Sequence, residues 1–385
     1  MTLPPERPAT PLWDDHPWTP LPRLEHDAAA DVCVVGLGGS GLTALGELHR
    51  LGVTAVGLDA CQVAGGAAGR NGGFLLAGTA DFYNDTVRAL GRERAAAFYR
   101  LTLDELDRIQ AATPGAVRRE GSLRIAASPD EEAHCAAQLA ALVADGLPAE
   151  AYDGPEGRGI LLPTDGVFNP LLRCRLLARA LLDAGIALYE DSPAVDLRPG
   201  EVVTPLARVR CGTVLVAVDG NLELLLPELR GRVTSARLHM VGTAPAPEVD
   251  VPRPVYRRWG WEYWQQLPDG RIALGGFRDH GGPGEWTGTT TANGNVHARL
   301  ETFLRDHIGA RAPVTHRWTG VISFTEDHLP VFEEIRPGIW VIGAYSGTGN
   351  VIGALCGRAA AQVVVDGRSA LAAPLRGVAD GATPR

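Results

Sequence analysis

Residues 31–59 read DVCVVGLGGSGLTALGELHRLGVTAVGLD, and this stretch decides the fold. DVCVVG is a short apolar run that ends at Gly36, LTALGELHRLG has apolar residues at helical spacing, and VTAVGLD is a second apolar run. Short continuous apolar runs are typical of strands buried on both faces, and a helix between two of them predicts a βαβ unit. We therefore expect an α/β lobe that begins at residue 31.

The turn between the first strand and the helix has the pattern G-x-G-x-x-G, which lets the backbone approach a pyrophosphate at a helix N-terminus. Asp59 ends the second strand, 23 residues after Gly36, where it can accept hydrogen bonds from an adenosine ribose. A glycine turn that binds nothing is the alternative, and the acid at 59 argues against it. The candidate dinucleotide contacts are Gly36, Gly38, Gly39, Ser40, Gly41, Asp59 and Ala60.

Two further glycine-rich segments predict close backbone approach to a ligand. GGAAGRNGG at 65–73 is too small to build a core, so it is either a ligand-binding loop or a mobile surface loop. GAYSGTGN at 343–350 opens a helix whose N-terminal dipole would stabilise negative charge on a reduced flavin, unless it is only a helix cap. The candidate contacts are Arg70, Asn71, Gly72, Gly73, Gly347, Thr348, Gly349 and Asn350.

Composition limits the possible functions. At 385 residues, with 45% hydrophobic and 21% charged residues, the chain is long enough for two folded lobes. The net charge of −9 argues against a nucleic-acid partner. All 36 basic residues are arginine, which excludes Schiff-base chemistry and a lysine general base.

The chain lacks the features of a membrane or secreted protein. No run approaches the ~20 apolar residues of a membrane span, and residues 1–30 do not resemble a signal peptide, so we expect a cytoplasmic protein. The six cysteines are scattered singly, which indicates reduced thiols and no metal site.

Patterns along the chain predict its domain organisation. Residues 1–30 read as an irregular arm anchored by Trp13 and Trp18, and residues 371–385 as a flexible tail. The fold class is α/β plus α+β: a discontinuous Rossmann-like lobe and a second lobe with a mostly antiparallel sheet and helices. The first lobe is expected to contain 31–80, 157–231 and 318–370, and the second 81–156 and 232–317.

Aromatic residues of the second lobe are candidates for a substrate wall that would attract a cationic amine, although packing alone would also explain them. Arg278 is a candidate for pairing with a substrate carboxylate, with a surface salt bridge as the alternative. His239 and His328 appear singly, so we interpret them as structural. The candidate substrate-binding residues are Tyr256, Trp259, Trp261, Trp264 and Phe324, and the candidate catalytic residues are Tyr263, Arg278 and Tyr345.

The three glycine segments in this order, with an aromatic sheet lobe between them, resemble the D-amino-acid-oxidase-type FAD family, which includes sarcosine, glycine and amine oxidases. The resemblance covers nearly the whole chain. It is strongest to the γ-glutamylputrescine oxidoreductase-like branch, at WDDHPWTPLPRL (13–24), GRNGG (69–73), LLLPELRGRV (224–233) and LPDGRIALGGFRD (267–279). It implies a substrate lobe that roofs the isoalloxazine, and an FAD contact at Val195.

Departures from the family pattern are informative. Some members attach FAD to a cysteine near the segment that corresponds to 318–326, but WTGVISFTE has none, so we expect noncovalent FAD. Ile322 and Gly347 stand where glycine-oxidase-like members place carboxylate-clamping arginines, which makes a simple α-amino acid a poorer candidate substrate. The stretch 272–275 lacks the lysine that sarcosine-oxidase-like members use with oxygen. Oxygen is then a poor acceptor, or Arg278 assists it.

The resemblance implies oxidation of a C–N bond in an amine or amino-acid-like small molecule by hydride transfer to flavin N5, giving an imine that hydrolyses. Oxygen or another acceptor would then reoxidise the flavin. The alternatives are a D-amino-acid or glycine-type oxidase or dehydrogenase of a carboxylated substrate, an NAD(P)-dependent dehydrogenase, and a flavin-binding module without catalysis.

Overall fold

The βαβ unit expected at residues 31–59 forms the centre of the first lobe. The computed structural model describes residues 9–375, in which β1 (Ala28–Val35), α1 (Gly39–Arg50) and β2 (Ala55–Leu58) follow one another. Val32 and Val34 face one hydrophobic core, and Cys33 and Val35 face another. Burial on both faces explains why this strand is an unbroken apolar run.

The first sheet combines a parallel centre with antiparallel edges. β9, β2, β1, β12 and β19 pair in parallel, whereas β10, β11 and β18 pair antiparallel at its sides. The added strands are β9 (Ala187–Tyr189), β10 (Asp196–Arg198), β11 (Glu201–Val203), β12 (Arg208–Val216), β18 (Val331–Arg336) and β19 (Ile339–Gly343). The predicted Rossmann-like lobe is confirmed.

Helices α1, α6 (Pro170–Asp183) and α9 (Ile352–Asp366) contribute to the core on one face of this sheet. α6 begins where the sequence favours a start, because Asn169 caps it by accepting from Leu172 N at 2.9 Å and Pro170 occupies its first turn. The other face is covered by Leu222, Leu226 and Leu229, from the short elements α7 (Leu222–Leu225) and η2 (Pro227–Leu229).

The second sheet is antiparallel except where β14 meets β5. Its order is β17 (Val314–Thr325), β13 (Val233–Thr243), β16 (Ile272–Gly276), β15 (Glu262–Gln266), β14 (Val255–Arg257), β5 (Ser122–Ile125), β7 (Gly157–Leu162) and β6 (Glu150–Gly154). β15 and β16 form a hairpin whose turn is PDGR (268–271), a sequence typical of tight turns.

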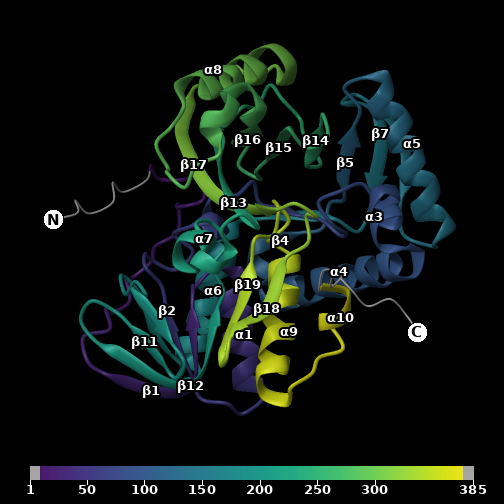
Figure 1. Ribbon diagram of the computed structural model, residues 1–385. Coiled ribbons are helices and arrows are strands. Elements are labelled where there is room, and N and C mark those ends of the chain that lie inside the picture. Colours follow the sequence, from purple (N-terminus) through teal and green to yellow (C-terminus); the bar gives the residue numbers. More distant parts are fainter. Residues whose placement is uncertain (1–8, 376–385) are drawn as a thin grey trace.

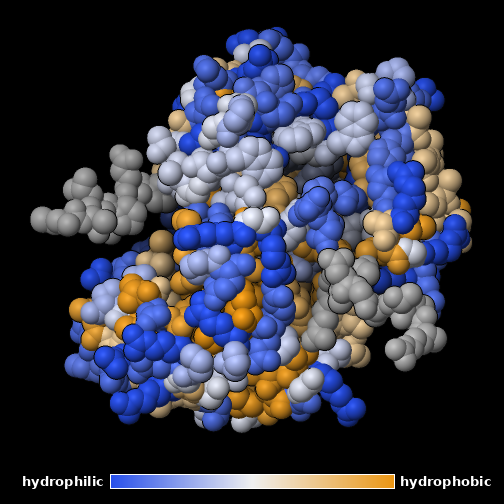
Figure 2. Space-filling view, viewed as in Figure 1, coloured by the Kyte–Doolittle hydropathy of each residue, from blue (hydrophilic) through white to orange (hydrophobic). Residues whose placement is uncertain are grey.

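Helices surround the second sheet, and Figure 1 shows this lobe above the first one. They are α3 (Tyr83–Leu90), α4 (Arg92–Ala112), α5 (Pro129–Ala144) and α8 (Gly294–Phe303), with the helical turns η3 (Arg278–Glu285) and η4 (Leu304–Ile308). In Figure 2 the end of this lobe around α8 is mostly hydrophilic, whereas hydrophobic patches lie over the first lobe. None of the helices in residues 9–375 is long and apolar enough to cross a membrane.

A third, small sheet lies between the lobes and contains β3 (Phe74–Leu75), β8 (Gly166–Phe168) and β4 (Val117–Arg118). The remaining short elements are α2 (Ala67–Arg70), η1 (Pro114–Ala116) and α10 (Ala372–Leu375).

The structure places two domain boundaries differently from the sequence expectation. β7, expected in the first lobe, pairs with β5 in the second sheet, and β17 pairs with β13 through Thr325. The chain therefore returns to the first lobe at β18, not at residue 318. A strand's apolar pattern shows that it is buried but not which sheet it joins, because its pairing partners are distant in sequence.

Within the described residues, both ends of the chain contribute buried side chains. Trp13 is 1% exposed, and Trp18 donates from Nε1 to Glu190 Oε1 at 2.8 Å, which confirms the predicted anchors of the arm. Residues 28–30, predicted to belong to the arm, begin β1. At the other end Ala372 and Leu375 are buried in α10, while the rest of the predicted tail lies outside the described residues.

Trp13→Ala is expected to lower the free energy of unfolding by about 3–5 kcal/mol, the usual cost of truncating a buried tryptophan. The side chain donates to Asn71 O at 2.8 Å and packs edge-on against Trp318, so the loss also loosens the 65–73 loop. Urea unfolding measures it, with Leu224→Ala, at a side chain 62% exposed, as the control. Equal losses in the two variants would contradict an anchoring role for the arm.

Candidate active site

The first glycine turn has the geometry of a dinucleotide cradle. Gly36 has a φ of +108°, and a Cβ on Gly41 would overlap the Gly36 carbonyl oxygen, so this close approach of turn and helix requires glycine. Gly38 is the N-cap of α1, and no side chain caps the helix there. The first N–H groups of α1 are thus left for a ligand.

Asp59 closes this turn from the end of β2. Its carboxylate accepts from Leu37 N at 2.7 Å and from Cys61 N at 2.8 Å. Burial raises its pKa to about 6, against the lowering effect of these two hydrogen bonds. Ala60 beside it is exposed, and Ser40 is buried under the turn. Asp59 therefore stands at the edge of the cradle, next to the glycine turn.

Arg173 is a feature that sequence reasoning missed. It projects from α6 and is only 3% exposed, yet its Nε has no hydrogen-bond partner within residues 9–375. Its Nη1 lies 2.8 Å from where a Cβ of Gly39 would stand, at the start of α1. The buried Glu105 carboxylate interacts with this charge, but it leaves Nε without a hydrogen bond. A buried donor without an acceptor is costly unless an anion joins it, so this group fits a pyrophosphate in the cradle. A lone arginine in a helical pattern gives no such signal in the sequence.

The second glycine segment is fixed by its neighbours on all sides. Arg70 Nε donates to Thr319 O and Nη2 donates to Ala9 O, each at 2.6 Å, so this side chain is committed to backbone carbonyls. Asn71 Oδ1 accepts from Gly73 N at 2.8 Å and from Asn350 Nδ2 at 3.1 Å. The structure thereby brings the second and third glycine segments together. These contacts argue against the alternative of a mobile surface loop at residues 65–73.

The third glycine segment is a strained turn that ends at α9. Ala344 and Ser346 have positive φ values of 53° and 51°, and Tyr345 N between them donates to Asp219 Oδ1 at 3.0 Å. Burial raises the pKa of Asp219 to about 6. This carboxylate at the end of β12 holds the turn, and the sequence gave no reason to single it out.

A cavity of about 570 Å³ lies between the two lobes, and residues of the second and third glycine segments line it. Tyr256 and Tyr263 stack on one wall with ring centroids 5.7 Å apart, and both meet Phe74 edge-on. Burial raises the pKa of Tyr256 to about 12 and that of Tyr263 further. Of the predicted site residues, the lining includes Arg70, Asn71, Gly72, Tyr256, Trp259, Trp261, Tyr263, Arg278, Phe324, Gly347, Thr348 and Asn350.

Among the predicted residues outside the first glycine turn, Trp264, Tyr345 and Val195 point away from this cavity. Trp264 points to the opposite face of β15 and packs against Phe303 at 5.5 Å, because successive side chains of a strand alternate between faces. The Tyr345 side chain is buried in the core of the first lobe. Val195 is 60% exposed, and its N–H donates to Val203 O at 2.8 Å.

The departures that the sequence singled out lie in the cavity. Ile322 and Gly347 both contribute to its lining, and a Cβ on Gly347 would stand 3.9 Å from Ile322 Cδ1. No cysteine belongs to the lining formed by residues 9–375. Trp286 and Phe82 also line it, and both were missed because their neighbours in sequence gave no motif.

A sequence-family model described as "FAD dependent oxidoreductase" (DAO) matches residues 31–363, which include all three glycine segments. The chain belongs to this family. FAD is therefore its cofactor, and the cradle, the unsatisfied Nε of Arg173 and the cavity beside the last glycine turn fit that molecule.

Relatives by sequence cover most of the chain. "Gamma-glutamylputrescine oxidoreductase" of Escherichia coli is 25% identical over 90% of this chain and 86% of its own length. "Probable oxidoreductase OrdL" of Rhizobium meliloti is 26% identical over 90% of this chain and 85% of its own. The resemblance to this branch of the family is thereby confirmed.

Solved structures show the same fold. L-proline dehydrogenase from P. horikoshii has a TM-score of 0.75 at 16% identity and covers 90% of this chain and 96% of its own. Glycine oxidase from Geobacillus kaustophilus has a TM-score of 0.73 at 19% identity, covering 90% of this chain and 98% of its own.

Arg173→Met is expected to weaken FAD binding about tenfold or more while leaving the apoprotein as stable as before, or more stable. The reason is that methionine removes a desolvated charge whose Nε has no hydrogen-bond partner, and also a phosphate partner. Quenching of flavin fluorescence measures the Kd and urea unfolding the stability. Arg175→Met on the same helix is the control, because Arg175 pairs with Asp14 at 2.8 Å. It should lower the stability of the apoprotein and leave the FAD affinity unchanged. Unchanged FAD affinity in Arg173→Met would refute the phosphate role.

Asp219→Asn tests the buried carboxylate through pH. Because the pKa of Asp219 is raised to about 6 in the folded protein, the unfolded chain loses this proton at a lower pH than the folded chain does. Ionisation of Asp219 therefore lowers the free energy of unfolding of the wild type as pH rises from 4 to 7, by up to about 3 kcal/mol at pH 7. Asparagine keeps the acceptor for Tyr345 N without the charge, so its stability relative to wild type should rise over this range. Urea unfolding of the apoprotein at pH 4 and at pH 7 measures the difference in stability between variant and wild type. Asp250→Asn, at an exposed residue, is the control. A pH-independent difference would be evidence against the raised pKa.

Proposed function

We propose that this protein oxidises a C–N bond of a small amine or amino-acid-like molecule, giving an imine that water hydrolyses. One observation carries the proposal: a single cavity is lined by the second and third glycine segments on one side and by aromatic residues of the second sheet on the other. The named chemistries of similar proteins, at γ-glutamylputrescine, glycine and L-proline, support this reaction class.

FAD, when bound, supplies the two-electron acceptor for the hydride that leaves the substrate α-carbon. We propose that Gly38, Gly39 and Arg173 hold its pyrophosphate and Asp59 its adenosine ribose. Asn71, Thr348 and Asn350 would hold the ring end, where the N-terminus of α9 favours negative charge.

The chain's own side chains orient the substrate and exclude water. Because burial raises the pKa of both Tyr256 and Tyr263, the two phenols stay protonated near neutral pH and do not act as general bases. We propose that they form the wall over the reacting carbon and that Tyr263 donates a hydrogen bond to the substrate. The substrate amine then reacts in its neutral form, and its proton passes to solvent.

Three finer points belong to this proposal. FAD is held noncovalently, because no cysteine lines the cavity within the described residues. Oxygen or another acceptor closes the cycle. The enzyme acts in the cytoplasm on a free small molecule.

Purified holoprotein is expected to lose its visible flavin absorption when mixed anaerobically with at least one member of an amine and amino-acid panel. Tyr263→Phe should reduce the limiting rate of this bleaching about tenfold, the effect of one lost hydrogen bond. Trp264→Phe, on the other face of the same strand, should change it less than about twofold.

No bleaching by any member of the panel would leave a flavin-binding module as the better description. Acid precipitation tests the attachment of FAD separately, and a yellow pellet would contradict noncovalent binding.

A further inference from the structure

Arg278 has an unusual setting at the roof of the cavity. Its guanidinium carbon lies 4.4 Å from the ring centroid of Trp286, 4.9 Å from that of Trp261 and 5.1 Å from that of Phe324. Three rings around one guanidinium hold it in place by cation–π contact. Trp261 and Phe324, two of the aromatic residues expected to attract a cationic amine, are thus already occupied by a cation of the protein.

No carboxylate of residues 9–375 lies within ion-pair distance of Arg278, and the two nearest in sequence are held by other cations. Asp279 pairs with Arg258 at 2.7 Å. Glu285 accepts from Arg237 Nε at 2.9 Å and Nη2 at 3.0 Å. The positive charge of Arg278 is therefore balanced by no direct contact and remains available to an anion.

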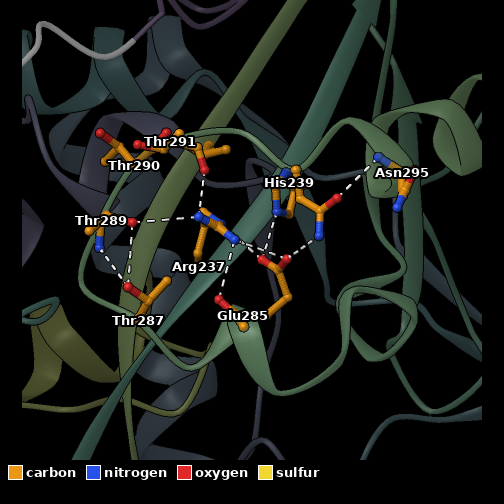
Figure 3. Close-up of polar contacts among 11 residues, drawn as sticks. Arg237, His239, Glu285, Thr287, Thr289, Thr290, Thr291 and Asn295 are labelled. Carbon is orange, nitrogen blue, oxygen red and sulfur yellow. Dashed lines mark hydrogen bonds and ion pairs between the residues drawn. The ribbon is translucent and has the colours of Figure 1, made fainter.

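The Glu285 contacts also fix the segment that carries Arg278. Figure 3 shows Arg237 and His239 of β13 converging on this carboxylate, which is fully buried. His239 Nε2 lies 2.8 Å from Glu285 Oε2, and Asn293 Nδ2 donates to Oε1 at 2.7 Å. Burial would raise the pKa of Glu285, but these hydrogen bonds lower it to about 2, so it stays ionised. η3 begins at Arg278 and ends at Glu285, so this buried anchor positions Arg278 and the adjoining Trp286.

Other cations in the lining are committed elsewhere. Arg70 donates to two backbone carbonyls, and His328 pairs with Asp81 at 2.8 Å. Arg124 lies 4.7 Å from the Phe82 ring centroid, where its charge interacts with the buried Asp165 carboxylate. Ile322 and Gly347 add no charge.

We propose that Arg278 is the anion subsite of this enzyme and that its substrate is an amine bearing a carboxylate, which this guanidinium binds while the C–N bond lies against the Tyr256 and Tyr263 wall. The inference rests on the proposed function for the amine, but the anion subsite stands on the Arg278 geometry alone. It differs from a clamp at positions 322 and 347, because it comes from the end of β16 and is cushioned by aromatic rings.

The arrangement also selects against a substrate with a positive charge at this end. A partly buried guanidinium repels a cationic group, and it favours the neutral form of a nearby amine, which is the reactive form. A carboxylate forms paired hydrogen bonds with the planar fork of an arginine that the rings already orient. Little side-chain freedom is then lost on binding.

Butyrate and butyramide provide a test that needs no turnover, since neither carries an oxidisable amine. Each is titrated into holoprotein, and the shift of the flavin absorption spectrum gives a Kd. Butyrate should bind at least tenfold more tightly than butyramide, and Arg278→Gln should weaken butyrate binding about tenfold or more while leaving butyramide unchanged. Arg299→Gln, which removes the same charge from the exposed side of α8, should leave both Kd values within about twofold.

Arg278→Lys is the second variant. Because it keeps the charge but loses the planar fork, it should recover only part of the butyrate affinity. No preference for butyrate in the wild type, or equal butyrate affinity in wild type and Arg278→Gln, would overturn the proposal. Failure of the proposed function looks different: no amine would reduce the flavin, while Arg278-dependent binding of butyrate would remain.

Discussion

The hydrogen bond between Asn350 Nδ2 and Asn71 Oδ1 joins the two glycine segments beside the cavity, and the site depends on it. Glycine turns let a ligand approach the backbone, but they have no side chains to hold themselves in place. Other groups must therefore fix them: Trp13 and Trp318 donate to the carbonyls of Asn71 and Arg70, and Asp219 accepts from Tyr345 N. The rigid parts of the site thus lie around the glycines.

The two sheets contribute different parts of the site. The parallel centre of the first sheet places the ends of β1, β2 and β12 at one edge, where the cradle, Asp59 and Asp219 stand. The antiparallel second sheet presents every second side chain to the cavity, so Tyr263 reaches it and Trp264 does not. The proposed cofactor contacts therefore come mostly from backbone groups, and the proposed substrate wall is formed by side chains.

Ion pairs between residues distant in the sequence determine which charges in the cavity remain free. Glu285 and Asp279 would neutralise Arg278 if they were free, but Arg237, His239 and Arg258 hold them away. His239, which the sequence left as a lone histidine, is part of a buried ionic anchor. A network of this kind is costly unless every partner is satisfied, and here it fixes the segment that roofs the cavity.

The sequence by itself determined the features that depend on neighbours along the chain: the βαβ unit, the glycine turns, the β15–β16 hairpin, the cap of α6 and the FAD family. These follow from hydrophobic period, turn chemistry and backbone freedom, which act over a few residues. Only the tertiary structure decided which sheet β7 and β17 join and that Tyr345 turns into the core. It also decided that Arg173 Nε has no hydrogen-bond partner, and Arg278 no carboxylate within ion-pair distance, among residues 9–375. Those facts depend on groups that are distant in the sequence, as Arg70 and Thr319 are, and no local pattern records which distant groups will meet.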